Sequence, residues 1–121
     1  HGNYPTRQVT AGNTAFFSFA MPSNISEIRK AAIRFIPTNT GTVDWTVTSS
    51  YANFDEDENL NSGSLTADAK SATDDLIEEI DVTDLLKNTA DLSNQVGLKL
   101  TVDALSTTSN IEVLGLIVLY T

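Results

Sequence analysis

The sequence predicts an all-β fold, namely a single-domain antiparallel β-sandwich of the jelly-roll type with at most one or two short helical turns. Short apolar segments with a period of two recur along the chain, and turn-forming residues separate them. No long segment has a helical period. A length of 121 residues suits one domain, which we divide into an N-terminal arm, residues 1–13, and a β-sandwich, residues 14–121.

The first strand is expected in residues 14–20. Residues 1–13 are polar and contain turn formers, so we expect an irregular lead-in there. In residues 14–20, Phe17 and Phe19 fall on one side of a strand and Phe16 on the other. The Met-Pro pair that follows ends this strand.

A second and a third strand are expected in residues 28–36 and 42–51. Pro37 ends the second strand, and the turn-forming segment TNTG, residues 38–41, predicts a hairpin between the two. Trp45 has the same phase as the apolar residues of the third strand, so we expect it in the core rather than on the surface.

The acidic middle of the chain has the weakest pattern. Residues 53–73 predict an exposed, mobile stretch that holds at most an edge strand. Residues 76–82 fit a strand, and residues 83–88 fit a short helical turn that places Leu85 and Leu86 under the edge of the sheet.

The C-terminal quarter of the chain has the clearest strand signals. Residues 95–102 alternate between apolar and polar without interruption, which predicts a strand with one buried face. A polar connection is expected in residues 104–110. It leads into residues 111–120, IEVLGLIVLY, whose nearly continuous apolar character predicts a central strand buried on both faces.

The charge balance excludes some partners. The chain has 16 acidic and 7 basic residues and a formal net charge of -9, so repulsion opposes binding to nucleic acid or to an anionic membrane. It contains no cysteine, which excludes disulfides and thiolate metal sites. No apolar run is long enough for a transmembrane helix.

The residues offer little for catalysis. His1 is the single histidine, so a catalytic triad would need a terminal residue as its base. No glycine pattern of a nucleophile elbow occurs. We therefore expect that the protein is not an enzyme and that it binds no cofactor.

A calcium site is left open as an alternative. Asp55, Asp57 and Asn59 place oxygen ligands at alternate positions, as the start of a calcium loop does. The pattern then departs from an EF-hand, since Leu60 stands where that loop has glycine and Thr66 where it has glutamate. A solvated run of charges is the simpler interpretation.

Four segments carry a resemblance to known proteins. They are AFFSFAMPSNISEIRKAAIRFIPTNTGTVDWTVTSSYA, EIDVTDLL, QVGLKLTV and IEVLGLIVLYT, and they cover most of the chain. In these segments the chain resembles small jelly-roll proteins of phage and phage-like metagenomic genomes, which look like virion components. The order of elements is also similar to that of DNRLRE-type jelly-roll modules of secreted bacterial proteins, although the motif that names them is absent. Neither resemblance implies a catalytic residue.

The first resemblance implies a non-enzymatic structural module of a virus particle, either a capsid decoration or part of a tail or fibre. Its partners would be other virion proteins and further copies of the chain, and trimers are a common state of such modules. Its place would be the virion or the extracellular space. We expect contacts through the arm and the acidic loop, at Tyr4, Arg7, Tyr51, Phe54 and Glu56.

The alternative function is that of an extracellular carbohydrate-binding module. Sugar rings lie on exposed aromatic side chains, and only 7% of the residues are aromatic. In this alternative Tyr51, Phe54 and the acidic loop would bind the sugar, with calcium assisting.

Overall fold

The structure, a computed structural model, describes residues 5–21, 26–52, 55, 57, 61–86, 95–106 and 110–121. In these residues it contains eight strands and one short helix. In chain order they are β1 (Arg7–Val9), β2 (Thr14–Ala20), β3 (Ile28–Pro37), β4 (Gly41–Ala52), β5 (Asn61–Ala72), β6 (Glu78–Asp81), α1 (Thr83–Leu86), β7 (Gln95–Ser106) and β8 (Ile111–Tyr120).

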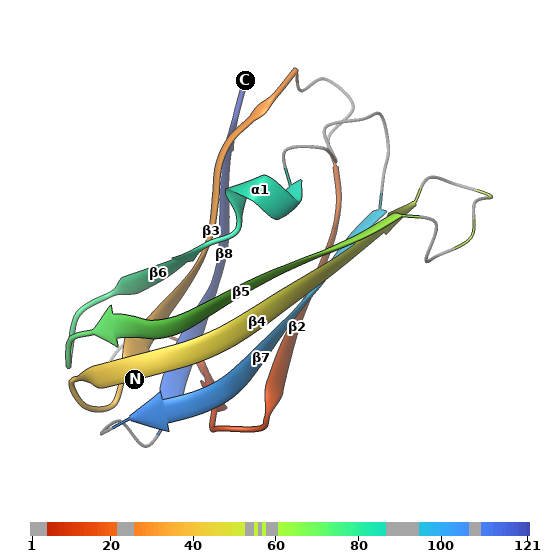
Figure 1. Cartoon of the computed structure of the whole chain (residues 1–121). Coiled ribbons are helices and arrows are strands. Elements are labelled where there is room, and N and C mark those ends of the chain that lie inside the picture. The colour runs from red at the N-terminus through yellow and green to blue at the C-terminus, as the bar shows by residue number, and fades with distance from the viewer. Residues whose placement is uncertain are drawn as a thin grey trace.

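The strands form two four-stranded antiparallel sheets that pack face to face (Figure 1). We name them after one strand in each. The β8 sheet has the order β1-β8-β3-β6, and the β7 sheet has the order β2-β7-β4-β5. The chain crosses between the sheets at most of its connections, and this order is that of a jelly roll. The predicted fold class is therefore confirmed.

The core lies between the sheets and follows the alternation of the sequence. Every second residue of β7 from Val96 to Val102 is buried, and Ile33 and Phe35 of β3 are fully buried in the same core. Each such side chain contributes about 1.5–3 kcal/mol of hydrophobic stabilisation when buried. Trp45 is 5% exposed, which confirms that it belongs to the core.

The strand β8 is central, but the prediction that both its faces are buried is wrong. It lies between β1 and β3, yet Leu119 is 49% and Tyr120 51% exposed. A β-bulge at Leu114 explains the continuous apolar run. Val113 pairs with Phe35 and Gly115 pairs with Arg34, so Leu114 lies opposite no residue of β3. The extra residue between them reverses which side chains point inward, and Gly115 has a φ of 154° that other residues rarely adopt.

The predicted hairpin across residues 38–41 is also wrong. The strand β3 belongs to the β8 sheet, whereas β4 pairs with β5 and β7 in the other sheet. The turn therefore carries the chain from one layer to the next. Alternation determines which face of a strand is buried and leaves its neighbours undetermined, so the sequence pattern could not distinguish the two arrangements.

Three further segments differ from their predictions. Residues 7–9 form β1 rather than an irregular lead-in, because they pair with β8 and bury Val9 in the core. The division at residue 13 otherwise stays a prediction. The predicted edge strand of the acidic region is longer than expected, since β5 pairs with β4 along most of its length. The strand β7 continues to Ser106, into the expected polar connection.

The helix α1 lies where it was predicted and packs against strands of both sheets. Leu85 and Leu86 are buried. The backbone of Ala31 on β3 fixes the start of the helix, since its N–H donates to the Thr83 hydroxyl at 3.0 Å. Facing the helix from β5, Gly63 leaves room for Leu85: a Cβ at this position would lie 3.0 Å from the Leu85 Cδ2 atom.

The replacement Gly63→Ala tests this packing. We expect it to lower the free energy of unfolding by on the order of 1 kcal/mol, because Leu85 has to shift out of its position. Urea unfolding of the purified protein measures the effect. The matched control is Gly97→Ala in β7 of the same sheet, where the added Cβ meets only the Ser50 carbonyl oxygen at 3.9 Å. Equal losses in the two variants would contradict a close fit at Leu85.

Candidate interaction surfaces

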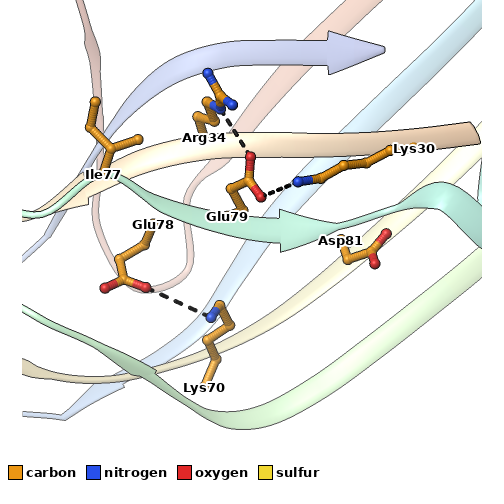
Figure 2. Close-up of a pocket in the computed structure, with 7 residues that line it drawn as sticks. All are labelled: Lys30, Arg34, Lys70, Ile77, Glu78, Glu79 and Asp81. Atoms are coloured by element: carbon orange, nitrogen blue, oxygen red, sulfur yellow. Dashed lines mark hydrogen bonds and ion pairs between the residues drawn. The ribbon is translucent and has the colours of Figure 1, made fainter. Parts of the chain in front are cut away.

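The outer face of the β8 sheet carries a cluster of ion pairs, which we call the Glu79 cluster: Lys30, Arg34 and Glu79. Arg34 pairs with Glu79 across β3 and β6. One carboxylate oxygen of Glu79 accepts from the Lys30 Nζ at 2.7 Å and the other from the Arg34 Nε at 3.0 Å (Figure 2). The cluster borders a shallow hollow of about 720 Å³.

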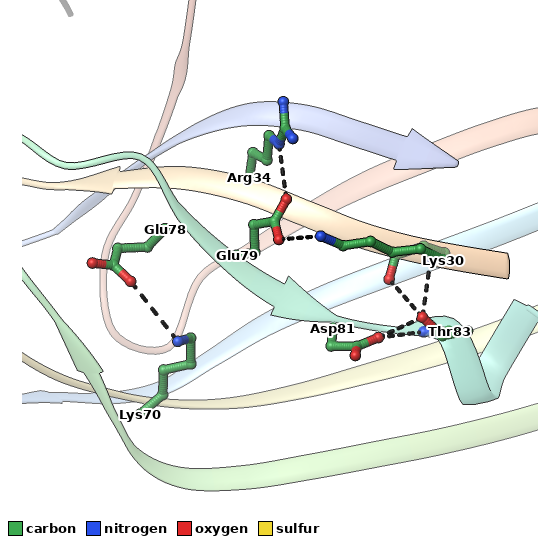
Figure 3. A network of polar contacts seen from close by, with 8 residues as sticks. Lys30, Arg34, Lys70, Glu78, Glu79, Asp81 and Thr83 are labelled. Atoms are coloured by element: carbon green, nitrogen blue, oxygen red, sulfur yellow. Dashed lines mark hydrogen bonds and ion pairs between the residues drawn. The ribbon is translucent and has the colours of Figure 1, made fainter. Parts of the chain in front are cut away.

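The hydrogen bonds from Lys30 and Arg34 hold the pKa of Glu79 below its ordinary value. The pKa of Asp81 is lowered as well, because its carboxylate accepts from the hydroxyl and the backbone N–H of Thr83 at 2.6 and 2.9 Å (Figure 3). Both groups stay ionised at neutral pH. A general acid requires the opposite shift, so these carboxylates suit a structural role.

The two lateral sides of the sandwich are built differently. On the side of β5 and β6, which we call the closed side, α1 contacts both sheets, and Lys70 of β5 lies 3.9 Å from Glu78 of β6 (Figure 3). On the side of β2 and β8, which we call the open side, two shallow pockets of about 370 and 410 Å³ lie between the sheets. The second is lined by Phe17, Phe19, Leu116 and Val118 with Ser18.

The open side includes an incompletely paired strand. Residues 111–113 of β8 pair with β1, and beyond them β8 pairs with β3 alone among the described strands. We call residues 114–120 the β8 edge. The edge contains no charged residue, and its last two residues are about half exposed. Natural sheets usually protect such an edge with charges or proline, which marks this one as a contact candidate.

Of the residues predicted for contacts, the structure describes Arg7 and Tyr51, which lie in different sheets. Arg7 is exposed on β1 and borders the open side. Tyr51 is half-buried at the end of β4 and packs against the core, which leaves little of its ring for a sugar platform. Tyr4, Phe54 and Glu56 lie outside the described residues, so their contact roles stay predictions.

The calcium alternative also stays a prediction. Asp55 and Asp57 are exposed, and Asn59, like His1, lies outside the described residues. In the part of the chain that the structure describes, no group of three or more histidine, cysteine, aspartate or glutamate residues is close enough together to hold a metal ion. No helix of that part has the length and apolar character needed to cross a membrane.

Sequence reasoning missed both the Glu79 cluster and the β8 edge. The cluster depends on the pairing of β3 with β6, more than 40 residues apart along the chain, and a period of two does not reveal such pairing. A signal for the edge was present. Residues 113–121 carry no charge, and a continuous apolar run that is not buried on both faces has an exposed apolar side.

Comparison with known proteins supports the fold. No protein-family model matches the chain, and no curated protein matches it. A chain in the structure of infectious bursal disease virus, Gx strain, aligns with a TM-score of 0.54 and 12% identity, over 95% of this chain and 29% of that one. A chain in the structure of the Gt strain aligns with a TM-score of 0.40 and 8% identity, over 97% of this chain and 33% of that one.

The first of these similarities shows that the jelly-roll fold also occurs in a protein of a virus structure. At 12% identity it shows the fold alone. The TM-score of 0.40 is too low to establish a shared fold. This chain spans less than a third of the Gx strain chain, so the activity and partners of that whole protein do not transfer to it directly.

The replacement Glu79→Gln tests the ion pairs. Because folding lowers the pKa of Glu79, its charge stabilises the folded state at pH values above the ordinary 4.5. This contribution is lost as the pH falls through the folded-state pKa. At neutral pH we expect the free energy of unfolding of the variant to be lower by about 1 kcal/mol. The loss is no larger because Lys30, Arg34 and Glu79 are partly exposed and solvent screens their charges. In strong acid its stability should equal that of the wild type.

Urea unfolding at the two pH values measures this difference. The matched control is Glu27→Gln. The Glu27 Oε1 atom lies 4.0 Å from the Arg29 Nε atom, and both side chains are largely exposed. We therefore expect this variant to keep nearly the full free energy of unfolding. If Glu79→Gln lowers the free energy of unfolding by the same amount in acid as at neutral pH, the ion pairs are not the cause of the loss.

Proposed function

We propose that this chain is a non-enzymatic structural module of a virus particle, either on the capsid surface or in a tail or fibre. The observation that carries the proposal is the complete jelly roll, which aligns over 95% of its length with part of a chain in a virus structure. The resemblance of the sequence to jelly-roll proteins of phage and phage-like genomes points the same way. The proposal places the chain in the virion or outside the cell.

The surface chemistry supports a role without catalysis. The hollow beside the Glu79 cluster is lined largely by charged groups that pair with each other. The lowered pKa values of Glu79 and Asp81 keep both carboxylates ionised. With a net charge of -9, the partners that fit are proteins rather than nucleic acid or anionic membrane.

The β8 edge supports assembly with further copies of the chain. Two β8 edges can pair antiparallel about a two-fold axis, because an isologous contact uses the same surface on both copies. Repulsion between two acidic chains is smallest where the contact has no charge, and residues 113–121 have none. This geometry favours a dimer over the trimer expected from the resemblance. Other virion proteins would then contact the remaining faces.

The replacement Leu119→Glu tests assembly through the β8 edge. Leu119 pairs with Lys30, so a glutamate here has a cation beside it within the chain, but it adds like charges between two copies. We expect the wild type to have twice the mass of 13.0 kDa in native mass spectrometry and sedimentation, and the variant to be monomeric.

The matched control is Leu76→Glu, since Leu76 is similarly exposed, at 53%, but lies in the connection between β5 and β6. It should leave the mass unchanged. A monomeric wild type, or dissociation by both variants alike, would contradict pairing through the β8 edge.

Detection in particles tests the proposed function itself. Virus particles purified from the source material, analysed by peptide mass spectrometry and by immunogold labelling with antibodies to this chain, should contain it as a stoichiometric component. Labelling of the capsid or of the tail distinguishes the two positions. Absence of the chain from particles that contain the other structural proteins would overturn the proposal.

A further inference from the structure

The outer face of the β7 sheet contains a shallow hollow that adjoins the open side at strand β2. Its volume is about 360 Å³, within the range of about 300–1,000 Å³ that small-molecule sites occupy. Residues from β2, β7 and β4 line it from outside the core. We call this site the hydroxyl hollow and define it by Phe16, Ser18, Thr48, Ser50, Gly97 and Lys99.

Strand register brings these residues together. Phe16 pairs with Lys99, which pairs with Thr48, so the three form one row across the sheet. Ser18, Gly97 and Ser50 form the next row in the same way. Side chains of paired residues in antiparallel strands point to the same face, and the intervening residue Leu98 is buried.

The absence of a side chain at Gly97 makes the hollow. Gly97 stands between Ser18 and Ser50 in its row, so backbone forms the floor and hydroxyls stand on both sides. A Cβ added at Gly97 would lie no closer than 3.9 Å to another atom, the Ser50 carbonyl oxygen. The space above this floor is therefore not required for packing of the chain itself. The strands β7 and β4 are central in their sheet, which makes the floor rigid.

Phe16 stands at the rim of the hollow and is 71% exposed. A single exposed apolar residue is ordinary on protein surfaces. Here, however, the ring stands beside hydroxyl groups and a cation within one hollow. An aromatic face next to hydrogen-bonding groups suits a ligand that has an apolar face and a polar rim.

Of the residues that the structure describes, Lys99 is the one charged residue that lines the hollow. Among the described residues it has no ion-pair partner, whereas Lys30, Arg34 and Lys70 each have one. An ammonium group that no described carboxylate pairs with, in a strongly acidic protein, favours a ligand that brings a single negative charge.

We propose that the hydroxyl hollow binds a glycan through a sugar residue that carries one carboxylate. The C–H face of the sugar ring lies on Phe16, its hydroxyls exchange hydrogen bonds with Ser18, Thr48 and Ser50, and its carboxylate accepts from Lys99. The net charge of -9 repels polyanions, so the glycan is one whose other sugars are neutral. This site is distinct from the sugar-binding patch at Tyr51 and Phe54 predicted from the sequence, which stays a prediction.

The proposal goes beyond a structural role in a particle and does not depend on it. A glycan site on an exposed sheet face would allow a virion component to attach to a cell surface or to secreted polysaccharide. The particle analysis above and the binding experiment below can therefore succeed or fail separately.

A glycan array tests the proposal with the purified full chain. The panel contains neutral oligosaccharides, the same oligosaccharides with one sialic or uronic acid, and sulfated polyanions. We expect saturable binding to at least one singly carboxylated glycan and little binding to the polyanions. Titration calorimetry with that glycan and its neutral counterpart then gives the affinities.

Three variants identify the site. Phe16→Ala should weaken binding by about tenfold because stacking is lost, and Gly97→Val should abolish it by filling the hollow. Lys99→Met should remove the preference for the carboxylated glycan over the neutral one. Leu76→Ala, on a residue of comparable exposure elsewhere, is the control and should bind like the wild type.

Unfolding curves confirm that each variant is folded, which we expect because Phe16 and Lys99 are exposed and the Gly97 position is open. If no glycan binds, or if Phe16→Ala and Gly97→Val bind as the wild type does, the hydroxyl hollow is not a glycan site. Equal affinity for neutral and carboxylated glycans in the wild type would overturn the role of Lys99.

Discussion

The structure depends on the burial of two apolar sheet faces against each other. Side chains alternate along a strand, so each residue that points into the core places its neighbours on the outside. In β7, burial of Leu98 and Leu100 places Gly97 and Lys99 on the outer face. The same constraint on β3 points Arg34 outward between Ile33 and Phe35, both buried. Packing of the core therefore also determines what both outer surfaces present.

The two lateral sides of the sandwich follow from how its edges are covered. On the closed side, α1 contacts strands of both sheets, and Leu85 packs so closely over Gly63 that a side chain at this position would force it to shift. On the open side, β1 covers only residues 111–113 of β8 among the described pairs. An edge strand of this kind presents backbone N–H and C=O groups with which another strand can pair. Assembly through this side would complete the sheet without disturbing the closed side.

The outer faces of the two sheets differ in chemistry. On the β8 sheet, Glu79 forms ion pairs with both Lys30 and Arg34 across two strands. On the β7 sheet, Ser18 and Ser50 flank Gly97, and Lys99 has no ion-pair partner among the described residues. The first arrangement stabilises the fold, whereas the second forms the site proposed for a ligand.

The sequence by itself determined the class of fold, the buried face of most strands and the position of α1, because these depend on local periodicity. The burial of Trp45 follows from its phase in β4 alone. Only the tertiary structure decided which strands are neighbours. It separated β3 from β4, made residues 7–9 a strand, and placed a bulge at Gly115 that turned an apolar run into a half-exposed edge. It also brought Phe16 beside Lys99 and Gly97. Local alternation encodes the face of a strand, whereas pairing depends on long-range contacts, so the surfaces that suggest function could not be read from the pattern.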